Sequence, residues 1–304
     1  MSVKTLLVTG LSGFVGSHLR DSLPAWSGWK LLPEQAYDLL DPASLDAWLQ
    51  AGVPDAVIHL AGQTFVPAAF KDPAHTLQVN LLGTLNLLQA LKRAGFNGTF
   101  LFVSSGDVYG QVDEADLPIT ETLAPKPRNP YSVSKVAAEL LCQQWGYAEG
   151  WRMLIARPFN HIGPGQAASF VVPGMAQQIV RAGGAQRITL EVGDIDVSRD
   201  FLDVRDVISA YFALLEHGRS GEIYNLCSGE ERTVRELIVQ MSRLAGIDAE
   251  LVQDPARLRP ADQRRVVGCS EKLQTETGWK PGISITETLQ SVLSDWETRV
   301  VEEK

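Results

Sequence analysis

The fold is decided by the stretch Thr5-Leu6-Leu7-Val8-Thr9-Gly10-Leu11-Ser12-Gly13-Phe14-Val15-Gly16. Its first residues, Thr5 to Val8, are mostly apolar, which is typical of a buried parallel strand. The glycines that follow have the spacing G-x-x-G-x-x-G, which permits a tight turn, close approach of the backbone to a diphosphate, and close packing of a helix on the strand. The N-terminus of that helix would present free N–H groups. The stretch therefore predicts a dinucleotide-binding βα unit, and a turn without a ligand is the simpler alternative.

The same strand-then-helix pattern recurs along the first half of the chain. Apolar runs near residues 29–32, 55–60, 99–103 and 152–157 predict strands, and the segments between them predict helices. Repeated βα units form a parallel sheet. The predicted class is therefore α/β: a doubly wound parallel (Rossmann) sheet in residues 1–163, then a smaller C-terminal α/β region in residues 164–304 that covers the substrate. Part of residues 197–230 is expected to return to the first domain.

Composition argues against several functional classes. The chain has 304 residues and a formal net charge of −9, which opposes binding to nucleic acid or to an anionic membrane. No run reaches the ~20 apolar residues of a membrane helix, and the N-terminus has no signal-peptide pattern, so a cytoplasmic protein is expected. The three cysteines lack metal-ligand spacing and are expected to be reduced, with no metal bound: Cys142, Cys227 and Cys269.

Candidate catalytic groups stand at the start of a predicted helix, in Asn129-Pro130-Tyr131-Ser132-Val133-Ser134-Lys135. Pro130 suits the first helical turn. Tyr131 and Lys135 are four residues apart and therefore share a helix face. A lysine cation beside a phenol favours the phenolate and would lower the tyrosine pKa, which makes a general acid or base that works near neutral pH. Taken alone, the pair is a weak motif, and an ordinary helix surface is the simpler interpretation.

Further candidates follow predicted strands, where doubly wound sheets place their ligands. Ser105 follows the strand at residues 99–103, within Ser104-Ser105-Gly106-Asp107-Val108-Tyr109-Gly110. Glu34 follows the strand near residues 29–32 and could bind the adenosine ribose or be a solvated loop carboxylate, so the choice between NADH and NADPH stays open. His59 is expected to be a core histidine with satisfied hydrogen bonds.

The glycine loop, Ser105, Tyr131 and Lys135, in this order and each at a βα junction, resemble the extended short-chain dehydrogenase/reductase family. The resemblance implies that Ser105 hydrogen-bonds a substrate oxygen, that Tyr131 transfers the proton, and that Lys135 lowers the tyrosine pKa and holds the nicotinamide ribose. It implies a cofactor site made of Gly10, Gly13, Phe14, Val15, Gly16, Asp38, Leu39, Leu60, Ala61, Gly62, Tyr131, Lys135, Pro158 and His161. It also implies a nucleotide sugar bound by residues 164–304, with substrate contacts from Ser105, Gly106, Asp107, Asn160, Arg199 and Arg259.

Some of these positions keep a structural alternative. Asn80 matches a structural asparagine of the family. Arg199 and Arg259 match positions that hold the nucleotide diphosphate, to which the planar guanidinium is suited. Each arginine could instead form a surface ion pair, and the same two possibilities apply to Arg205, Arg264 and Arg265.

The loop after Ser105 indicates the reaction within this family. Sugar-nucleotide dehydratases carry a carboxylate base and a second polar group there, whereas this chain has Gly106, which has no proton to donate, and Asp107, which is one methylene shorter than glutamate. The motifs at residues 61–67, 104–110 and 159–166 resemble bacterial reductases that act on a GDP-linked 4-keto-6-deoxyhexose with NADPH or NADH. The alternatives are a 4-epimerase with tightly bound NAD and a non-catalytic sensor of dinucleotide or sugar nucleotide.

The family resemblance also implies a homodimer. Extended members commonly pair through two long helices into a four-helix bundle, and the helices predicted near residues 73–94 and 130–148 could serve. The alternative is that the apolar faces of these helices belong to the core of one chain.

Overall fold

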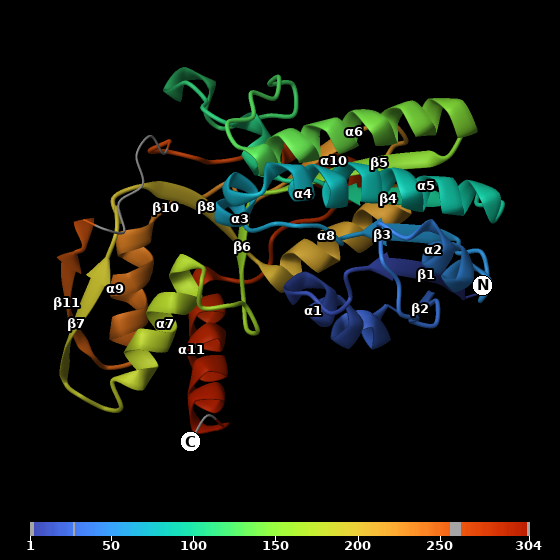
Figure 1. Cartoon of the computed structure of the whole chain (residues 1–304). Helices are drawn as coiled ribbons and strands as arrows, with labels where there is room; N and C mark the ends of the chain where they lie inside the picture. The colour runs from blue at the N-terminus through green and yellow to red at the C-terminus, as the bar shows by residue number, and fades with distance from the viewer. Residues whose placement is uncertain (1–2, 27, 256–262, 303–304) are drawn as a thin grey trace.

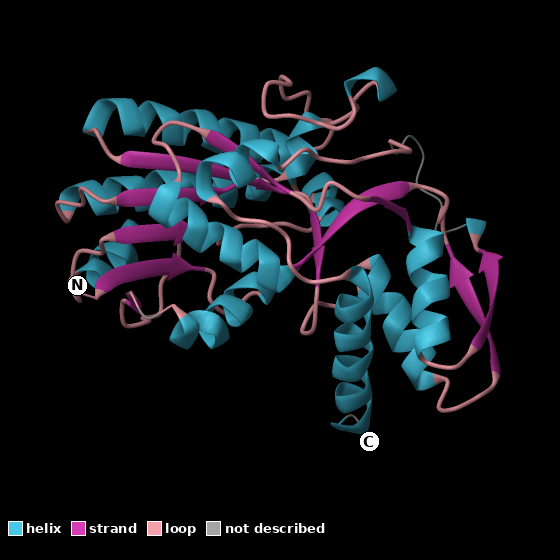
Figure 2. Cartoon of the chain, turned by 180° about the vertical axis from the view of Figure 1, so that it is seen from behind, coloured by secondary structure: helices cyan, strands magenta, loops and turns pink. Residues whose placement is uncertain are grey.

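A computed structural model describes residues 3–26, 28–255 and 263–302, and it contains the predicted doubly wound sheet (Figures 1 and 2). Six parallel strands lie in the order β2-β1-β3-β4-β5-β9. The chain moves outward from β1 to β2 and then returns to the other side of β1 with β3, so the order reverses between β1 and β3. Ligand sites of such sheets lie at the carboxyl ends of the strands beside this reversal. The strands are β1 (Lys4–Thr9), β2 (Trp29–Leu31), β3 (Ala56–His59), β4 (Thr99–Val103), β5 (Arg152–Pro158) and β9 (Ile223–Leu226).

Helices cover both faces of this sheet because the side chains of each strand alternate between two apolar faces. On β1, for example, Leu7 points into one core and Leu6 and Val8 point into the other. The face of Leu7 is covered by α2 (Pro42–Leu49), α5 (Gly83–Arg93) and α6 (Pro130–Glu149). The opposite face is covered by α1 (Phe14–Ser22), α8 (Val204–His217) and α10 (Glu271–Thr277).

The long helix predicted near residues 73–94 is divided by a π-helical turn. It comprises α4 (Pro73–Leu77), the π-helix η2 (Gln78–Leu82) and α5, and it is preceded by α3 (Val66–Lys71). Asp72 caps α4 by accepting a hydrogen bond from the backbone of His75. Asn80 lies inside the π turn, and such turns are frequent at functional sites.

The second region lies beside the carboxyl edge of the sheet and has its own core (Figure 1). It contains a three-stranded sheet in the order β10-β8-β6 and a parallel pair β11-β7. Three helices pack around a core that includes Leu237, Leu289 and Trp296. The elements are β6 (Asn160–Ile162), α7 (Val171–Arg181), β7 (Arg187–Val192), β8 (Ser198–Asp203), β10 (Glu231–Thr233), α9 (Val234–Leu244), β11 (Asp248–Gln253) and α11 (Ile285–Glu302).

The chain returns from this region to the large sheet. Helix α8 packs on β4 and β5, and β9 pairs with β5 as the sixth strand. The return extends beyond residues 197–230, because Leu273 of α10 and Trp279 also lie in the core of the large sheet. Short 3-10 helices complete the described structure: η1 (Leu23–Ala25), η3 (Gly106–Tyr109) and η4 (Glu114–Asp116). Among the described residues, no helix is both long and apolar enough to cross a membrane.

Candidate active site

The start of helix α6 carries the predicted catalytic pair. Asn129 is the N-cap residue: its side chain accepts a hydrogen bond from the Ser132 N–H at 2.8 Å, and Pro130 occupies the first turn. Tyr131 and Lys135 therefore point from the same helix face toward the end of β4, and both side chains are buried. The structure brings Ser105, Tyr131 and Lys135 together, and their catalytic roles stay a prediction.

Residues at the end of β4 contact α6 side chains spaced one helical turn apart. Residues four apart lie one above the other on a helix, so Tyr131, Lys135 and Glu139 form one row of side chains on α6. We call this set of contacts the β4–α6 seam. Its pairs are Val103 O with Lys135 Nζ at 2.8 Å, Ser104 Oγ with Glu139 Oε1, and the hydroxyl of Ser105 with that of Tyr131.

The pKa of Tyr131 is raised, whereas the sequence predicts that it is lowered. Burial raises the pKa of Tyr131 to about 12, the hydrogen bond from Ser105 lowers it by less, and the carboxylate of Asp107 raises it further. Lys135 does not offset the burial because its ammonium donates to the Val103 carbonyl and lies 5.9 Å from the centre of the Tyr131 ring. Burial also lowers the pKa of Lys135 to about 8. At neutral pH the phenol is therefore protonated and the lysine is mostly cationic.

The loop after Ser105 is fixed to the start of α6. Asp107 Oδ2 accepts hydrogen bonds from Asn129 Nδ2 at 2.7 Å and from Ser132 Oγ at 2.6 Å. The Ser105 side chain accepts from the Asp107 N–H at 3.1 Å. A Cβ added to Gly106 would lie 3.0 Å from the Phe159 ring, so any side chain at position 106 would have to displace that ring. The contact of Asp107 with a sugar hydroxyl stays a prediction.

The glycine loop has the geometry expected of a phosphate site. Gly10 has a φ of +78°, and a Cβ there would lie 2.9 Å from the backbone nitrogen of Ala61, so the loops after β1 and β3 touch. A Cβ on Gly16 would clash with the carbonyl oxygen of Gly10. Helix α1 has Gly13 as its N-cap residue, with no side-chain cap and no acidic residue in its first turn. Its N-terminal N–H groups therefore suit an anionic diphosphate, and the described residues fit a dinucleotide.

Other predicted cofactor residues surround this loop. The rings of Phe14 and His161 stack with centroids 6.1 Å apart, and His18 Nε2 lies 2.6 Å from the carbonyl oxygen of Pro164. These contacts join α1 to the segment that leads into the second region. Pro158 is buried at the end of β5, and Asn160 is exposed on β6.

The loop after β3 is held by Asn80. Asn80 Oδ1 accepts from the Gln63 N–H at 2.7 Å, and its Nδ2 donates to the Gln63 carbonyl at 2.9 Å and to Ser134 Oγ at 2.8 Å. Asn80 thus joins the loop at Leu60, Ala61 and Gly62 to helix α6 beside Lys135. A Cβ on Gly62 would lie 2.8 Å from Asn80 Oδ1, so this close approach requires glycine.

The two residues predicted to contact the adenine, Asp38 and Leu39, differ in exposure. Leu39 is buried in the core against α5, whereas Asp38 is exposed and accepts from the Leu40 N–H at 2.8 Å. Glu34 is exposed as well, and its charge helps to raise the pKa of Tyr37, mainly an effect of burial. The Tyr37 hydroxyl accepts from the Gly10 N–H at 2.6 Å, so this segment lies against the glycine loop.

His59 is the expected core histidine. It lies between Thr9 and Thr84, with ring nitrogens 2.7 Å and 3.0 Å from their hydroxyl oxygens. Burial, assisted by the nearby Lys135 cation, lowers the pKa of His59 to about 3, so the ring is neutral.

The arginines of the second region have defined partners. Arg199 lies on β8 and donates to the Ser198 carbonyl oxygen at 2.7 Å, and its diphosphate contact stays a prediction. Arg259 lies outside the described residues. The other three predicted candidates form ion pairs with carboxylates: Arg205 with Asp203 at 2.8 Å, Arg264 with Asp194 at 3.1 Å, and Arg265 with Glu231 at 2.7 Å.

Sequence reasoning missed the polar groups behind the catalytic pair. Glu139 is buried and accepts from Arg157 Nε at 2.9 Å and Nη2 at 2.6 Å, in addition to Ser104. Two signals were available. Glu139 stands four residues beyond Lys135, and Arg157 is a charged residue within an otherwise apolar strand.

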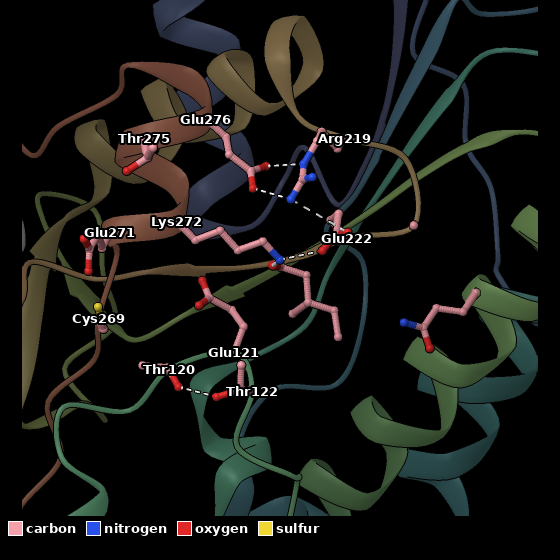
Figure 3. Close-up of a pocket in the computed structure, with 13 residues that line it drawn as sticks. Thr120, Glu121, Thr122, Arg219, Glu222, Cys269, Glu271, Lys272, Thr275 and Glu276 are labelled. Carbon is pink, nitrogen blue, oxygen red and sulfur yellow. Dashed lines mark hydrogen bonds and ion pairs between the residues drawn. The ribbon is translucent and has the colours of Figure 1, made fainter.

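A separate cavity of about 670 Å³ lies at the β9 edge of the large sheet (Figure 3). Its cationic side chains already face carboxylates: Arg219 faces Glu276, and Lys272 faces Glu222 at 2.7 Å. None of the predicted catalytic or cofactor residues lines it. The candidate active site is therefore separate from this cavity and lies at the carboxyl ends of β1, β3 and β4.

Comparison with known proteins identifies the family. The family model described as GDP-mannose 4,6 dehydratase matches residues 34–292. A GDP-6-deoxy-D-mannose reductase of Pseudomonas aeruginosa is 64% identical over 98% of this chain and 99% of its own length. A GDP-6-deoxy-D-talose 4-dehydrogenase of Aggregatibacter actinomycetemcomitans is 31% identical over 90% of this chain and 91% of its own.

A solved structure gives the same result in three dimensions. RMD from Pseudomonas aeruginosa, complexed with NADPH, superposes with a TM-score of 0.93 and 61% sequence identity, and the match covers 97% of this chain and 99% of that one. The sheet, the glycine loop and the serine, tyrosine and lysine at the end of β4 agree with this likeness. The chain belongs to the extended short-chain dehydrogenase/reductase family, in the group that the GDP-mannose 4,6-dehydratase model describes.

Proposed function

We propose that the protein reduces the 4-keto group of GDP-4-dehydro-6-deoxy-D-mannose to give GDP-6-deoxy-D-mannose (GDP-D-rhamnose), with NADPH or NADH as reductant. The observation that carries this proposal is that Ser105, at the end of β4, lies beside Tyr131, at the start of α6. Both lie near the glycine loop, and the helix that follows this loop has no side-chain cap. The likeness to a GDP-6-deoxy-D-mannose reductase supports the substrate, and the NADPH complex of the similar structure supports the cofactor.

Tyr131 is the proton donor in this proposal. When bound, the reduced nicotinamide supplies a hydride to C4 of the sugar. The carbonyl oxygen then becomes negative and takes the phenolic proton of Tyr131, which completes the alcohol. Because burial raises the pKa of Tyr131 to about 12, the proton is present at neutral pH and is released only to a strongly basic oxygen. A tyrosine that holds its proton at neutral pH suits reduction, in which the substrate oxygen must gain a proton.

Ser105 and Lys135 assist the transfer. The Ser105 hydroxyl lies beside the Tyr131 hydroxyl, so it can donate a hydrogen bond to the same substrate oxygen. The Lys135 cation is buried on the same helix face, and its field in this poorly solvated site stabilises the phenolate that remains after proton transfer. Asn160, Arg199, Arg259 and Asp107 are the proposed contacts to the nucleotide sugar.

The geometry after Ser105 favours reduction over dehydration. Elimination needs a carboxylate base and a neighbouring acid in the loop. Gly106 carries no side chain and the Phe159 ring restricts the space for one, and Asp107 Oδ2 already accepts two hydrogen bonds from the start of α6. We therefore propose a reductase, although the matching family model carries the name of a dehydratase.

The direct test is incubation of the protein with GDP-4-dehydro-6-deoxy-D-mannose and either NADPH or NADH. Loss of reduced-nicotinamide absorbance, with one product formed per cofactor oxidised, is the expected result. The epimerase alternative predicts that the purified protein carries NAD and interconverts stereoisomers without added reductant. The sensor alternative predicts binding of both ligands without turnover. Either of these outcomes would replace the proposal.

We also infer that two copies of the chain pair through α4–α5 and α6. These helices run side by side on one face of the sheet (Figure 1) and expose large apolar side chains. Leu140 is 62% exposed and Leu82 is 48% exposed. Helix α6 has 20 residues and is about 30 Å long, enough for a four-helix bundle with its copy. Leu140→Glu should convert a dimer to a monomer in light scattering, whereas Leu244→Glu on α9 should not.

We propose the cytoplasm as the compartment. All three cysteines are free thiols, and Cys142 and Cys227 are buried, which suits a reducing environment. Fractionation of the source cells would test this.

A further inference from the structure

Glu139 differs from the other charged groups of the β4–α6 seam because the proposed chemistry does not use it. It is 3% exposed and accepts hydrogen bonds from Ser104 on β4 and from Arg157 on β5. Burying a carboxylate and a guanidinium together is expensive, and their attraction roughly offsets the lost hydration. Stability alone therefore gives little reason for a charged pair at this place.

The position of Glu139 relates it to catalysis. It lies one turn beyond Lys135 and two turns beyond Tyr131 on the same face of α6. The carboxylate of Glu139 accepts a hydrogen bond from Ser104. The neighbours of Ser104 are Val103, which binds Lys135, and Ser105, which faces Tyr131. One carboxylate thus touches the ends of two strands and acts on the catalytic helix.

We propose that Glu139 is a positioning residue for the reduction, which keeps α6 in register with the end of β4 and keeps the Lys135 ammonium charged beside the reacting tyrosine. This inference rests on the proposed function. Glu139 itself touches neither substrate nor cofactor.

The charges around Lys135 support this role. Burial lowers the pKa of Lys135 to about 8, and the Glu139 carboxylate is the main group that raises it again, followed by Cys142 on the same helix. From β3, His59 faces the lysine but is neutral, because its pKa is about 3. From β5, Arg157 faces Glu139. If Glu139 lost its charge, Lys135 would face that guanidinium without a counter-charge, and the lysine pKa would fall below 8.

The test is Glu139→Gln, which keeps the shape and a hydrogen-bond acceptor but removes the charge. The pKa of Lys135 is measured directly by NMR titration of protein labelled at the lysine ε-carbon, with the signal assigned by its loss in Lys135→Met. We expect the pKa to fall by about one unit. In the reductase assay, kcat/KM should fall roughly fivefold near pH 8 and change little near pH 6, since that ratio reports the free enzyme.

Two control variants separate charge from packing. Ser104→Ala removes one hydrogen bond but keeps the carboxylate, so the pKa of Lys135 should stay where it is in the wild type. Glu149→Gln removes a carboxylate at the other end of α6, where it pairs with Lys92, and should change neither readout. An unchanged Lys135 pKa in folded Glu139→Gln, or an activity loss equal at all pH values, would overturn the inference. The NMR result stands even if the wild type proves inactive on this substrate, so the two proposals can fail separately.

Discussion

One bidentate arginine–carboxylate pair lies buried beside the β4–α6 seam and another lies on the surface of the second region, so their environments are opposite. Beside the seam, the Arg157 and Glu139 side chains are 3% and 4% exposed. In the second region, Arg235 and Asp196 make the same geometry with 46% and 57% exposure. Buried charges act strongly on their neighbours and must be held in place, whereas exposed charges are screened by water. The charges at the seam therefore act strongly on one another, whereas the exposed charges of the second region interact only weakly.

The largest effect is expected from the seam's reacting group. Tyr131→Phe removes the proton donor and should lower kcat by about 10²–10⁴-fold, because general acid catalysis typically contributes that much. Binding of the nucleotide sugar and of NADPH, measured by calorimetry, should stay near the wild-type value. Turnover close to that of the wild type would remove Tyr131 from the mechanism.

The next test breaks the buried pair. Arg157→Met leaves the Glu139 carboxylate buried without its counter-charge and should lower the free energy of unfolding by about 3–5 kcal/mol in urea titrations. Glu139→Gln combined with Arg157→Met should recover much of that loss, because the buried carboxylate that lacked its guanidinium partner is removed as well. If the double variant is as unstable as Arg157→Met alone, the lost stability comes from packing. Burial of charge would then not explain the difference from the exposed pair.

The seam should also make stability depend on pH. The pKa of Lys135 is about 8 in the folded chain and 10.5 in the unfolded chain, so between these values the unfolded chain binds more protons and stability rises with pH. The rise amounts to about 3 kcal/mol at 1.36 kcal/mol per pKa unit. Lys135→Met should lack this rise, so the difference between the two unfolding curves recorded across pH 8 to 10.5 measures it. Parallel curves would show that the lysine is better hydrated than its burial indicates.

The smallest effect belongs to the exposed pair. Arg235→Met removes the partner of Asp196 at the surface and should change the free energy of unfolding by less than about 1 kcal/mol. Moderate salt should reduce even this difference. A loss as large as that of Arg157→Met would mean that burial does not separate the two regions.

Much of the fold follows from local patterns. The strands at residues 99–103 and 152–157 are read correctly because buried parallel strands are short continuous apolar runs, and Gly10 marks the turn because its φ of +78° suits glycine. The division of the long helix by η2 was not predicted, since a π turn at Asn80 depends on the loop after β3 and on Ser134, which are distant in sequence.

Some features of the candidate site also follow from local patterns, and others depend on contacts between distant segments. The four-residue spacing of Tyr131 and Lys135 fixes that they share a helix face, and this needs only the period of the helix. The direction of the tyrosine pKa was predicted wrongly because it depends on burial, which no local pattern reports, and because the Lys135 ammonium is bound by the Val103 carbonyl.

The parallel sheet, the glycine loop and the shared helix face of Tyr131 and Lys135 follow from the sequence alone, because strand runs, turn residues and helical spacing are local properties. Three features become visible only in the folded chain: Tyr131 holds its proton, Asp107 is bound to the start of α6, and Glu139 and Arg157 form a buried pair between α6 and β5. These features depend on desolvation and on contacts between distant segments, and both exist only once the chain has folded.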